Sequence, residues 1–132
     1  MQFFIILEDH SEEVQKSIIR ETSNFDLIEY ALRSPNPKHR AAAALNINAS
    51  KFQIEVLSDD LDVEVRTAVL RNKEKTTGNI IDKMLSDDET FGYENLIVNH
   101  PNVCRETLER YIKYHHENEG LKIIAQKRLM YM

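Results

Sequence analysis

Glycine and proline are scarce in this chain of 132 residues, which contains only three of each. β-Sandwiches and β-barrels need many tight turns, so this scarcity disfavours both and favours a mostly helical protein. The chain also has no tryptophan and a single cysteine, Cys104. One cysteine excludes an internal disulfide and a cysteine-rich zinc or iron–sulfur site, and it suits a reducing compartment. We therefore expect a cytoplasmic helical protein without a cofactor.

Long apolar runs and an excess of basic residues are absent as well. No apolar stretch approaches the roughly 18 residues that span a bilayer, and the apolar segment from Phe3 to Leu7 lacks the basic leader of a secretory signal. Acidic residues outnumber lysine and arginine by 22 to 17, and the resulting net charge of −5 is the wrong sign for a general nucleic-acid binder. A chain with 42% hydrophobic and 30% charged residues is typical of a globular domain rather than a disordered one.

The sequence contains a repeat of 26 residues. Three classes of position recur at this spacing: candidate helix N-caps Asn24, Ser50, Thr76 and Asn102, a second set of N-caps Asn36, Asp62 and Asp88, and the pair Arg40 and Arg66. Such Ser, Thr, Asn and Asp side chains accept hydrogen bonds from the free N–H groups of a first helical turn. Because three independent classes share one spacing, we interpret it as a structural repeat.

Each repeat is predicted to contain two short helices. The first helices span roughly 12–21, 37–45, 63–71 and 91–98, the second span 25–33, 51–57, 77–85 and 103–114, and a closing helix covers 119–129. The second helices each carry one apolar stripe, formed for example by Phe52, Val56 and Leu57. The first helices are small and apolar on several sides, which is typical of a helix packed between neighbours.

This pattern predicts an all-α fold, a right-handed α-solenoid of about four two-helix repeats with a C-terminal capping helix. We expect one helical-repeat domain over residues 1–132. Its units are approximately 7–33, 34–58, 59–86 and 87–114, and the cap covers 115–132.

The stretch from Asp59 to Asn72 resembles the repeat of the leucine-rich-repeat-variant (LRV) family and, more loosely, HEAT-type helical arrays. In such repeats an acidic turn leads into Val-Arg, then a small apolar helix, then Asn. Residues 34–43 form a second copy, 9–15 a third with Gln in place of Arg, and 87–96 a degenerate fourth. The resemblance implies a stacked helical architecture and says little about activity. Variant repeats are similar to units that accompany an iron–sulfur cysteine cluster, and this chain has no such cluster.

The arginines and the paired aspartates have both a structural and a chemical interpretation. Arg40 and Arg66 are expected to pair with an acidic turn containing Asp59, Asp60 or Asp62, because a guanidinium binds a carboxylate through two parallel hydrogen bonds. Phosphate contact is the alternative. The pairs Asp59-Asp60 and Asp87-Asp88 suit a catalytic or magnesium site, but their recurrence at helix starts favours capping.

The remaining reactive residues do not form a recognisable active site. His10, His39 and His100 fall at turns, and His115, His116, Glu117 and Glu119 form either a metal site or, as we favour, a solvated linker. Cys104 lies on an apolar stripe and is expected to be buried. Glycine-rich phosphate loops, Gly-x-Ser-x-Gly and Cys-x-x-Cys are missing. We predict no enzyme, no catalytic residue and no metal site.

The polar side of the second helices is the candidate binding surface. Stacked repeats form extended surfaces that bind partners, and this side contains Asp26, Glu29, Arg33, Lys51, Glu55, Asn79, Asp82, Lys83, Glu106, Glu109 and Arg110. The predicted function is a protein–protein interaction module for a basic protein, in one form a small cytoplasmic inhibitor or immunity-type protein.

Two alternatives remain open. One is a nucleic-acid-binding HEAT-like protein related to DNA-repair glycosylases, for which Lys51, Lys73, Lys75, Lys83 and Arg105 would supply a basic stripe. The other is a scaffold that self-assembles through the apolar segments 3–7 and 129–132. The expected state is a monomer or weak homo-oligomer that does not associate with membranes, and its acidity disfavours nucleic acid as a partner.

Overall fold

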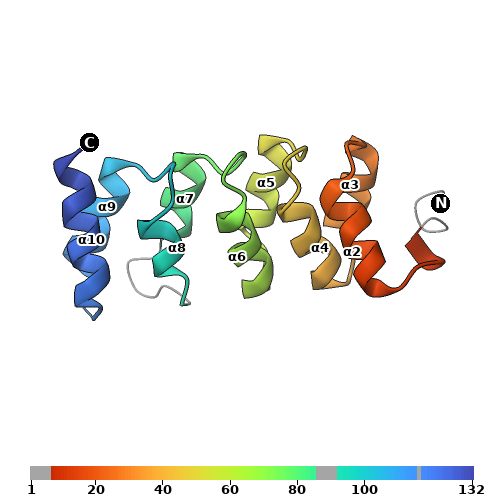
Figure 1. Ribbon diagram of the computed structural model, residues 1–132, viewed down its shortest axis with the longest axis horizontal. Coiled ribbons are helices and arrows are strands. Elements are labelled where there is room, and N and C mark those ends of the chain that lie inside the picture. The colour runs from red at the N-terminus through yellow and green to blue at the C-terminus, as the bar shows by residue number, and fades with distance from the viewer. Residues whose placement is uncertain (1–6, 86–91, 116) are drawn as a thin grey trace. The chain divides into compact units, whose positions relative to one another are not determined.

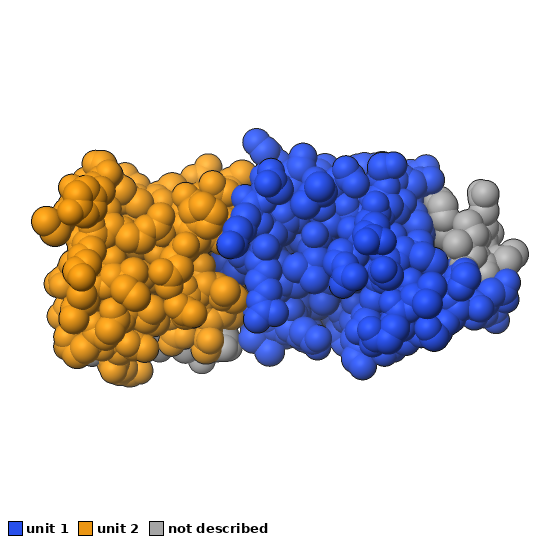
Figure 2. All heavy atoms as spheres, in the orientation of Figure 1, with its two compact units in different colours: residues 1–75 blue, residues 76–132 orange. Residues whose placement is uncertain are grey.

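The computed structural model describes residues 7–85, 92–115 and 117–132, and these residues form helices joined by short turns, without a strand among them (Figure 1). The prediction of an all-helical protein is therefore confirmed for this part of the chain. Contacts divide the chain into two compact units, residues 1–75 (unit 1) and 76–132 (unit 2), coloured separately in Figure 2. The division between residues 75 and 76 falls inside the third predicted repeat, 59–86.

Unit 1 contains two layers of helices. The helices are α2 (Glu12–Glu21), α3 (Phe25–Leu32), α4 (Pro37–Ala44), α5 (Lys51–Ser58) and α6 (Val63–Arg71). The first helices α2, α4 and α6 pack side by side, while the second helices α3 and α5 pack against them. Ala41 to Ala44 of α4 are all buried, since their short side chains allow neighbouring helices to approach on several sides.

Unit 2 repeats this layering. Its helices are α7 (Gly78–Met84), α8 (Glu94–Val98), α9 (Arg105–Tyr114) and α10 (Glu119–Met130). Helix α7 packs against α9, and α10 packs against both α8 and α9. Helix α10 therefore takes the place of a first helix beside α8. The core of unit 2 is formed by apolar side chains such as Ile81, Ile97, Leu108 and Tyr111.

Local capping explains most helix boundaries. Asn24, Asn36, Ser50 and Asp62 are the N-caps of α3, α4, α5 and α6, as predicted, and each side chain accepts a hydrogen bond from a first-turn N–H group. The predicted caps of the next two second helices are wrong. Thr77, one residue after Thr76, caps α7, and Cys104 occupies the N-cap position of α9 without a side-chain cap bond. Asp88 lies outside the described residues.

Buried asparagines connect successive first helices of unit 1. The Nδ2 of Asn46 donates to the backbone oxygens of Ile19, at 2.8 Å, and Thr22, at 2.7 Å. One repeat later, Nδ2 of Asn72 donates to the oxygens of Ala44, at 2.9 Å, and of Asn46 itself, at 3.0 Å. These bonds satisfy carbonyls that a helix end leaves without an intrahelical partner. The 26-residue spacing thus corresponds to a recurring contact between helices.

Unit 2 makes the equivalent contact with an arginine. Nη1 of Arg128, near the end of α10, donates to the backbone oxygens of Val98, at 2.7 Å, and His100, at 2.8 Å. As with Asn72, the two acceptors lie two residues apart at the end of the preceding first helix. Asn99, which follows α8 as Asn72 follows α6, is exposed, and its side chain donates to Asn95 of its own helix.

Two further expectations are wrong for the described residues. His39 lies within α4 rather than in a turn. Cys104 is half-buried rather than buried, because it stands at the entrance of α9. In the described ranges, no helix combines the length and apolarity that crossing a membrane requires.

Candidate interaction surface

The side of α5 that faces the core is not the one predicted from its apolar residues. Phe52 and Val56 were expected to pack inside, but they are 72% and 44% exposed. The buried residues of α5 are Gln53, Ile54, Leu57 and Ser58. Phe52 and Val56 lie one turn apart, so they form an apolar patch on the outer side of the second helices.

Hydrogen bonds to Gln53 set this orientation. Its N–H donates to the Ser50 hydroxyl oxygen at 3.0 Å, and its Oε1 accepts from the Ser50 N–H at 2.9 Å, which forms a capping box. Its Nε2 donates to Oε1 of Glu29 on α3 at 2.9 Å. The amide of Gln53 is therefore satisfied while buried, which leaves Phe52 on the surface.

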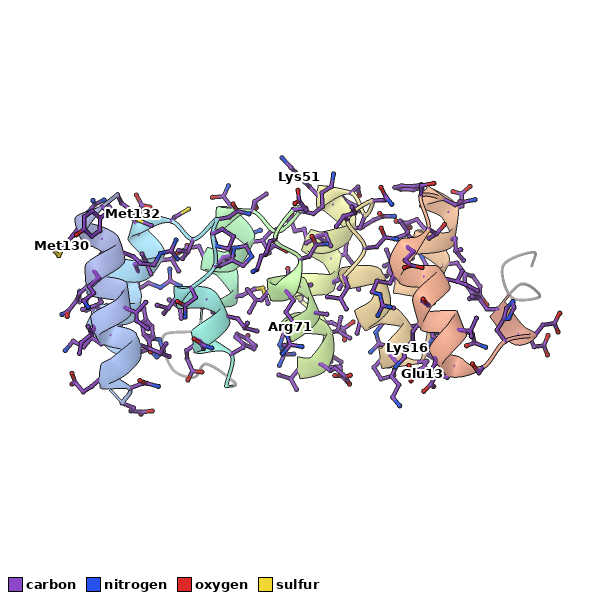
Figure 3. The ribbon with its side chains drawn as sticks, viewed as in Figure 1. Glu13, Lys16, Lys51, Arg71, Met130 and Met132 are labelled. Atoms are coloured by element: carbon purple, nitrogen blue, oxygen red, sulfur yellow. The ribbon has the colours of Figure 1, made fainter. Side chains whose placement is uncertain are left out.

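The polar residues predicted for this side in unit 1 lie on α3 and α5, with Arg33 at the C-cap of α3. Asp26, Arg33, Lys51 and Glu55 are exposed, and Lys51 is seen at the start of α5 in Figure 3. Glu29 is half-buried and is held by Arg33 at 3.4 Å as well as by Gln53. We define the acidic–apolar surface by Asp26, Glu29, Phe52, Glu55 and Val56.

Two of the six predicted residues of unit 2, Asp82 and Arg110, are occupied by internal contacts. Oδ1 of Asp82 accepts hydrogen bonds from the Thr107 hydroxyl at 2.6 Å and from Nη1 of Arg110 at 2.8 Å. Nη2 of Arg110 also donates to the backbone oxygens of Asp82 and Leu85. These contacts join α7 to α9, so Asp82 and Arg110 have a structural role within the unit.

The other predicted residues of unit 2 lie at its surface. Glu109 is exposed and pairs with Arg105 at 3.7 Å, and Asn79, Lys83 and Glu106 are exposed too. Arg105, one of the five residues of the alternative basic stripe, also donates to the backbone oxygens of Leu129 and Met132.

The arginine–aspartate pairing expected from the repeat is present for Arg40. Nε of Arg40 donates to Oδ2 of Asp60 at 2.8 Å and Nη2 donates to Oδ1 at 3.2 Å. Nη1 of Arg40 donates to the Ser34 oxygen, six residues before it, and Nη1 of Arg66 donates in the same way to the Asp60 oxygen. Both guanidinium groups therefore fix the turn that precedes their own helix.

A hollow of about 480 Å³ lies at the turn between α3 and α4. It is lined by Leu7, Glu8, Gln15, Tyr30, Arg33, Ser34, Pro35, Asn36 and His39. Nε2 of Gln15 donates to the backbone oxygens of Leu7 and His10, so its Oε1 accepts from Nε2 of His39 at 2.8 Å. Nδ1 of His39 then accepts from the Ser34 hydroxyl at 3.2 Å. Burial lowers the pKa of His39, and the charge of Glu12 opposes this shift more weakly.

The Ser34–His39 pair has the residue types of a nucleophile and its base. In a catalytic triad a carboxylate stabilises the imidazolium, whereas here the neutral amide of Gln15 faces the imidazole. The same amide holds two backbone carbonyls of the segment before α2. We therefore interpret this chain of hydrogen bonds as an attachment of that segment to α4.

A second hollow, of about 380 Å³, lies on the outer side of the first helices in unit 1. Its floor contains Ala41 and Ala42, and its other lining residues are Glu13, Lys16, Ser17, Arg20, Lys38, Leu45 and Glu64. Two of its three cationic side chains are paired, Lys16 with Glu13 at 2.9 Å and Lys38 with Glu12 at 3.2 Å. Figure 3 shows Glu13 and Lys16 close together on α2.

The candidate metal-ligating residues do not come together in the part of the chain that the structure describes. No group of three His, Cys, Asp or Glu side chains there is arranged to hold an ion. His115 stacks on the Tyr111 ring with centroids 5.2 Å apart, and His116 lies outside the described residues.

Comparison with known proteins found no family model, no curated protein and no solved structure that matches this chain. Its function is therefore inferred from its own residues and their arrangement.

Proposed function

We propose that the protein is an interaction module that binds a basic protein through the acidic–apolar surface of unit 1. The observation that carries this proposal is the exposure of Phe52 and Val56 on the layer of helices, α3 and α5, that also carries the carboxylates of Asp26, Glu29 and Glu55. Large aromatic side chains at the centre of a polar surface are characteristic anchors of protein interfaces. Carboxylates around such an anchor attract a cationic partner and orient it.

The contrast between the two units supports placing the binding surface in unit 1. In unit 2, Asp82 and Arg110 neutralise each other and bind backbone and side-chain groups of their own unit. A partner would have to break those contacts before it could bind either side chain, and that loss would weaken its affinity. In unit 1, Asp26 is exposed on α3, which packs against α5.

The test is capture of binding proteins from nuclease-treated lysate of the source cells, followed by affinity measurements on the captured protein. The double variant Asp26→Lys/Glu55→Lys is expected to weaken binding at least tenfold, since it reverses two charges beside the anchor. Phe52→Ser is expected to weaken binding to a similar extent because it removes the apolar anchor.

The matched control is Glu13→Lys/Glu64→Lys on the first helices of the same unit. It changes the net charge by the same amount at two exposed positions on the other layer. Equal weakening by both double variants would show that only overall charge matters and would contradict the proposed surface. An unchanged affinity in both would place the partner elsewhere on the chain.

We further propose that the repeat extends through both units as a right-handed α-solenoid of the LRV or HEAT-like type. Support comes from the matching contacts of Asn72 and Arg128, each with two carbonyls at the end of the preceding first helix. A crystal structure would test the handedness and the continuity directly. A solution scattering curve of two independently tumbling units would contradict the continuous form.

An inhibitor or immunity-type role is one specific form of this proposal. It requires that the captured basic partner be an enzyme or toxin, and that its activity fall when the protein is added in equal amount. Loss of that inhibition in Asp26→Lys/Glu55→Lys would connect the role to the acidic–apolar surface.

Polyanion binding remains a second candidate because of the hollow on the first helices. Lys16, Arg20 and Lys38 converge there, although Glu13 and Glu64 line the same hollow. Retention of single-stranded DNA or RNA at low salt, lost in Arg20→Glu, would support it. The absence of retention at low salt would exclude it.

A further inference from the structure

Helix α10 occupies the position of a first helix but differs from the others on its outer side. Arg128 contacts the preceding first helix as Asn72 does in unit 1, so Arg128 corresponds to Asn72 and to Asn46. Ala41 and Ala42 of α4 lie five and four residues before Asn46. Thr67 and Ala68 of α6 lie at the same two spacings before Asn72. At the corresponding positions α10 has Ile123 and Ile124.

These two isoleucines are large and exposed at positions where α4 and α6 have small side chains. Ala41, Ala42 and Ala68 are buried, whereas Ile123 and Ile124 are 47% and 36% exposed. Met130, two turns after Ile123, is also exposed, as are Tyr131 and Met132, and Figure 3 shows Met130 at the outer edge of α10. Large apolar side chains that are exposed together on one side of a helix mark an interaction surface.

The charges on the same side of α10 are arranged symmetrically about Ile123. Glu119 lies four residues before Ile123 and Lys127 lies four residues after it, and both side chains are exposed. Residues at this spacing share one side of a helix. When two such helices cross antiparallel at Ile123, each Glu119 approaches the Lys127 of the other. Gly120, between these positions on the exposed side, adds no side chain to the contact.

We propose that α10 is a self-association surface, through which two copies of the chain pair antiparallel across Ile123 and Ile124. The two-fold charge complementarity of Glu119 and Lys127 selects a second copy as the occupant, since a symmetric pair uses the same residues on both sides. A helix of 12 residues is about 18 Å long. The contact is therefore smaller than a standard interface, and we expect a dissociation constant on the order of 10 to 100 µM.

The test is sedimentation velocity of the full chain over a wide range of concentration. The expected result is a monomer at low micromolar concentration and a dimer at several hundred micromolar. Ile123→Asp is expected to remain monomeric throughout. Phe52→Asp is the matched control, since it places the same charge at an exposed apolar position of α5, and it is expected to dimerise as the parent chain does.

A charge exchange tests the antiparallel arrangement. Glu119→Lys places like charges opposite each other and is expected to weaken the dimer about tenfold. Glu119→Lys/Lys127→Glu restores opposite charges in both pairs, so its dissociation constant is expected to return to within threefold of the parent value. Circular dichroism of each variant checks that the helices are intact.

Three results would overturn the proposal. They are a monomer at the highest concentration, a dimer that persists in Ile123→Asp, and masses that grow beyond the dimer. The last result would indicate an open, head-to-tail assembly rather than a closed pair. Failure of the double exchange to restore dimerisation would overturn the antiparallel arrangement.

Discussion

Arg40 and Asp60 form a two-bond ion pair that connects the first helix of one repeat to the acidic turn before the next. The side chains are only 20% and 12% exposed, and the second carboxylate oxygen also accepts from the backbone N–H of Asp62. Removing one partner leaves a largely buried charge without its counter-charge. Asp60→Ala is therefore expected to lower the free energy of unfolding by about 3 kcal/mol, measured by urea denaturation.

Arg40→Lys distinguishes the geometry of this pair from its charge. Lysine keeps the charge but cannot form the two parallel bonds to Asp60, so we expect a loss of about 1 to 2 kcal/mol. The control is Lys38→Ala, which removes an ion pair with Glu12 at 3.2 Å between two exposed side chains, a kind of pair that contributes little because water and salt screen it. If Arg40→Lys were no more destabilising than Lys38→Ala, the two-bond geometry would be unimportant.

The contact of Asn72 with the preceding first helix gives a second prediction. Its buried amide nitrogen donates to the oxygens of Ala44 and Asn46, so Asn72→Ala leaves two carbonyls without that donor. We expect a loss of about 2 to 3 kcal/mol in the free energy of unfolding. Asn99→Ala, at an exposed position that bonds only to its own helix, is expected to change stability by less than about 0.5 kcal/mol. Similar losses in the two variants would contradict the structural role of the buried asparagine.

The helices and the arginine pairing could be predicted from the sequence because both depend on local, repeated chemistry. Asn24, Ser50 and Asp62 cap the helices that they were expected to cap, and Arg40 pairs with Asp60 as expected. The orientation of α5 was wrong because Phe52 was judged by its hydrophobicity alone. The repeat itself contained the missing signal, since the buried residues Leu27, Ile28, Ala31 and Leu32 of α3, advanced by 26, become Gln53, Ile54, Leu57 and Ser58.

The candidate surface was predictable only in part. The exposure of Asp26 and Glu55 follows from helical periodicity, but the contacts of Asp82 with Thr107 and Arg110 depend on how α7 packs against α9. No local pattern contains that information. The identity of a partner depends on the partner's own surface, which this sequence does not encode.

The burial of His39 predicts a dependence of stability on pH. Burial lowers the pKa of His39 in the folded protein below its ordinary value of 6.5, so the unfolded chain binds a proton more readily. The stability that neutral His39 contributes to the folded protein is fully present above about pH 6.5. It is lost as the pH falls through the folded-state pKa of His39. Urea midpoints measured from pH 7.5 to 5 are expected to fall more steeply for the parent chain than for His39→Gln.

The control for this experiment is His10→Gln. His10 is exposed, and its backbone oxygen rather than its ring accepts the bond from Gln15. The variant is expected to keep the pH dependence of the parent chain. If His39→Gln and the parent chain lost stability in parallel on acidification, the burial of His39 would not be the source of the dependence.

Two glycines are predicted to respond to alanine in opposite directions. A Cβ added at Gly78 would overlap Sγ of Cys104 and lie within 2.8 Å of the backbone oxygen of Asn102, so α7 and the entrance of α9 would have to separate. Overpacking of this kind costs about 1 to 3 kcal/mol.

At Gly120 the nearest atom is Oδ1 of Asn118 at 3.4 Å, and alanine in a helix is favoured over glycine by about 0.5 to 1 kcal/mol. Thermal unfolding at low protein concentration, where α10 is unpaired, should therefore show a lower Tm for Gly78→Ala and a higher Tm for Gly120→Ala. An unchanged Tm in Gly78→Ala would mean that α7 and α9 are not held as closely as these distances require.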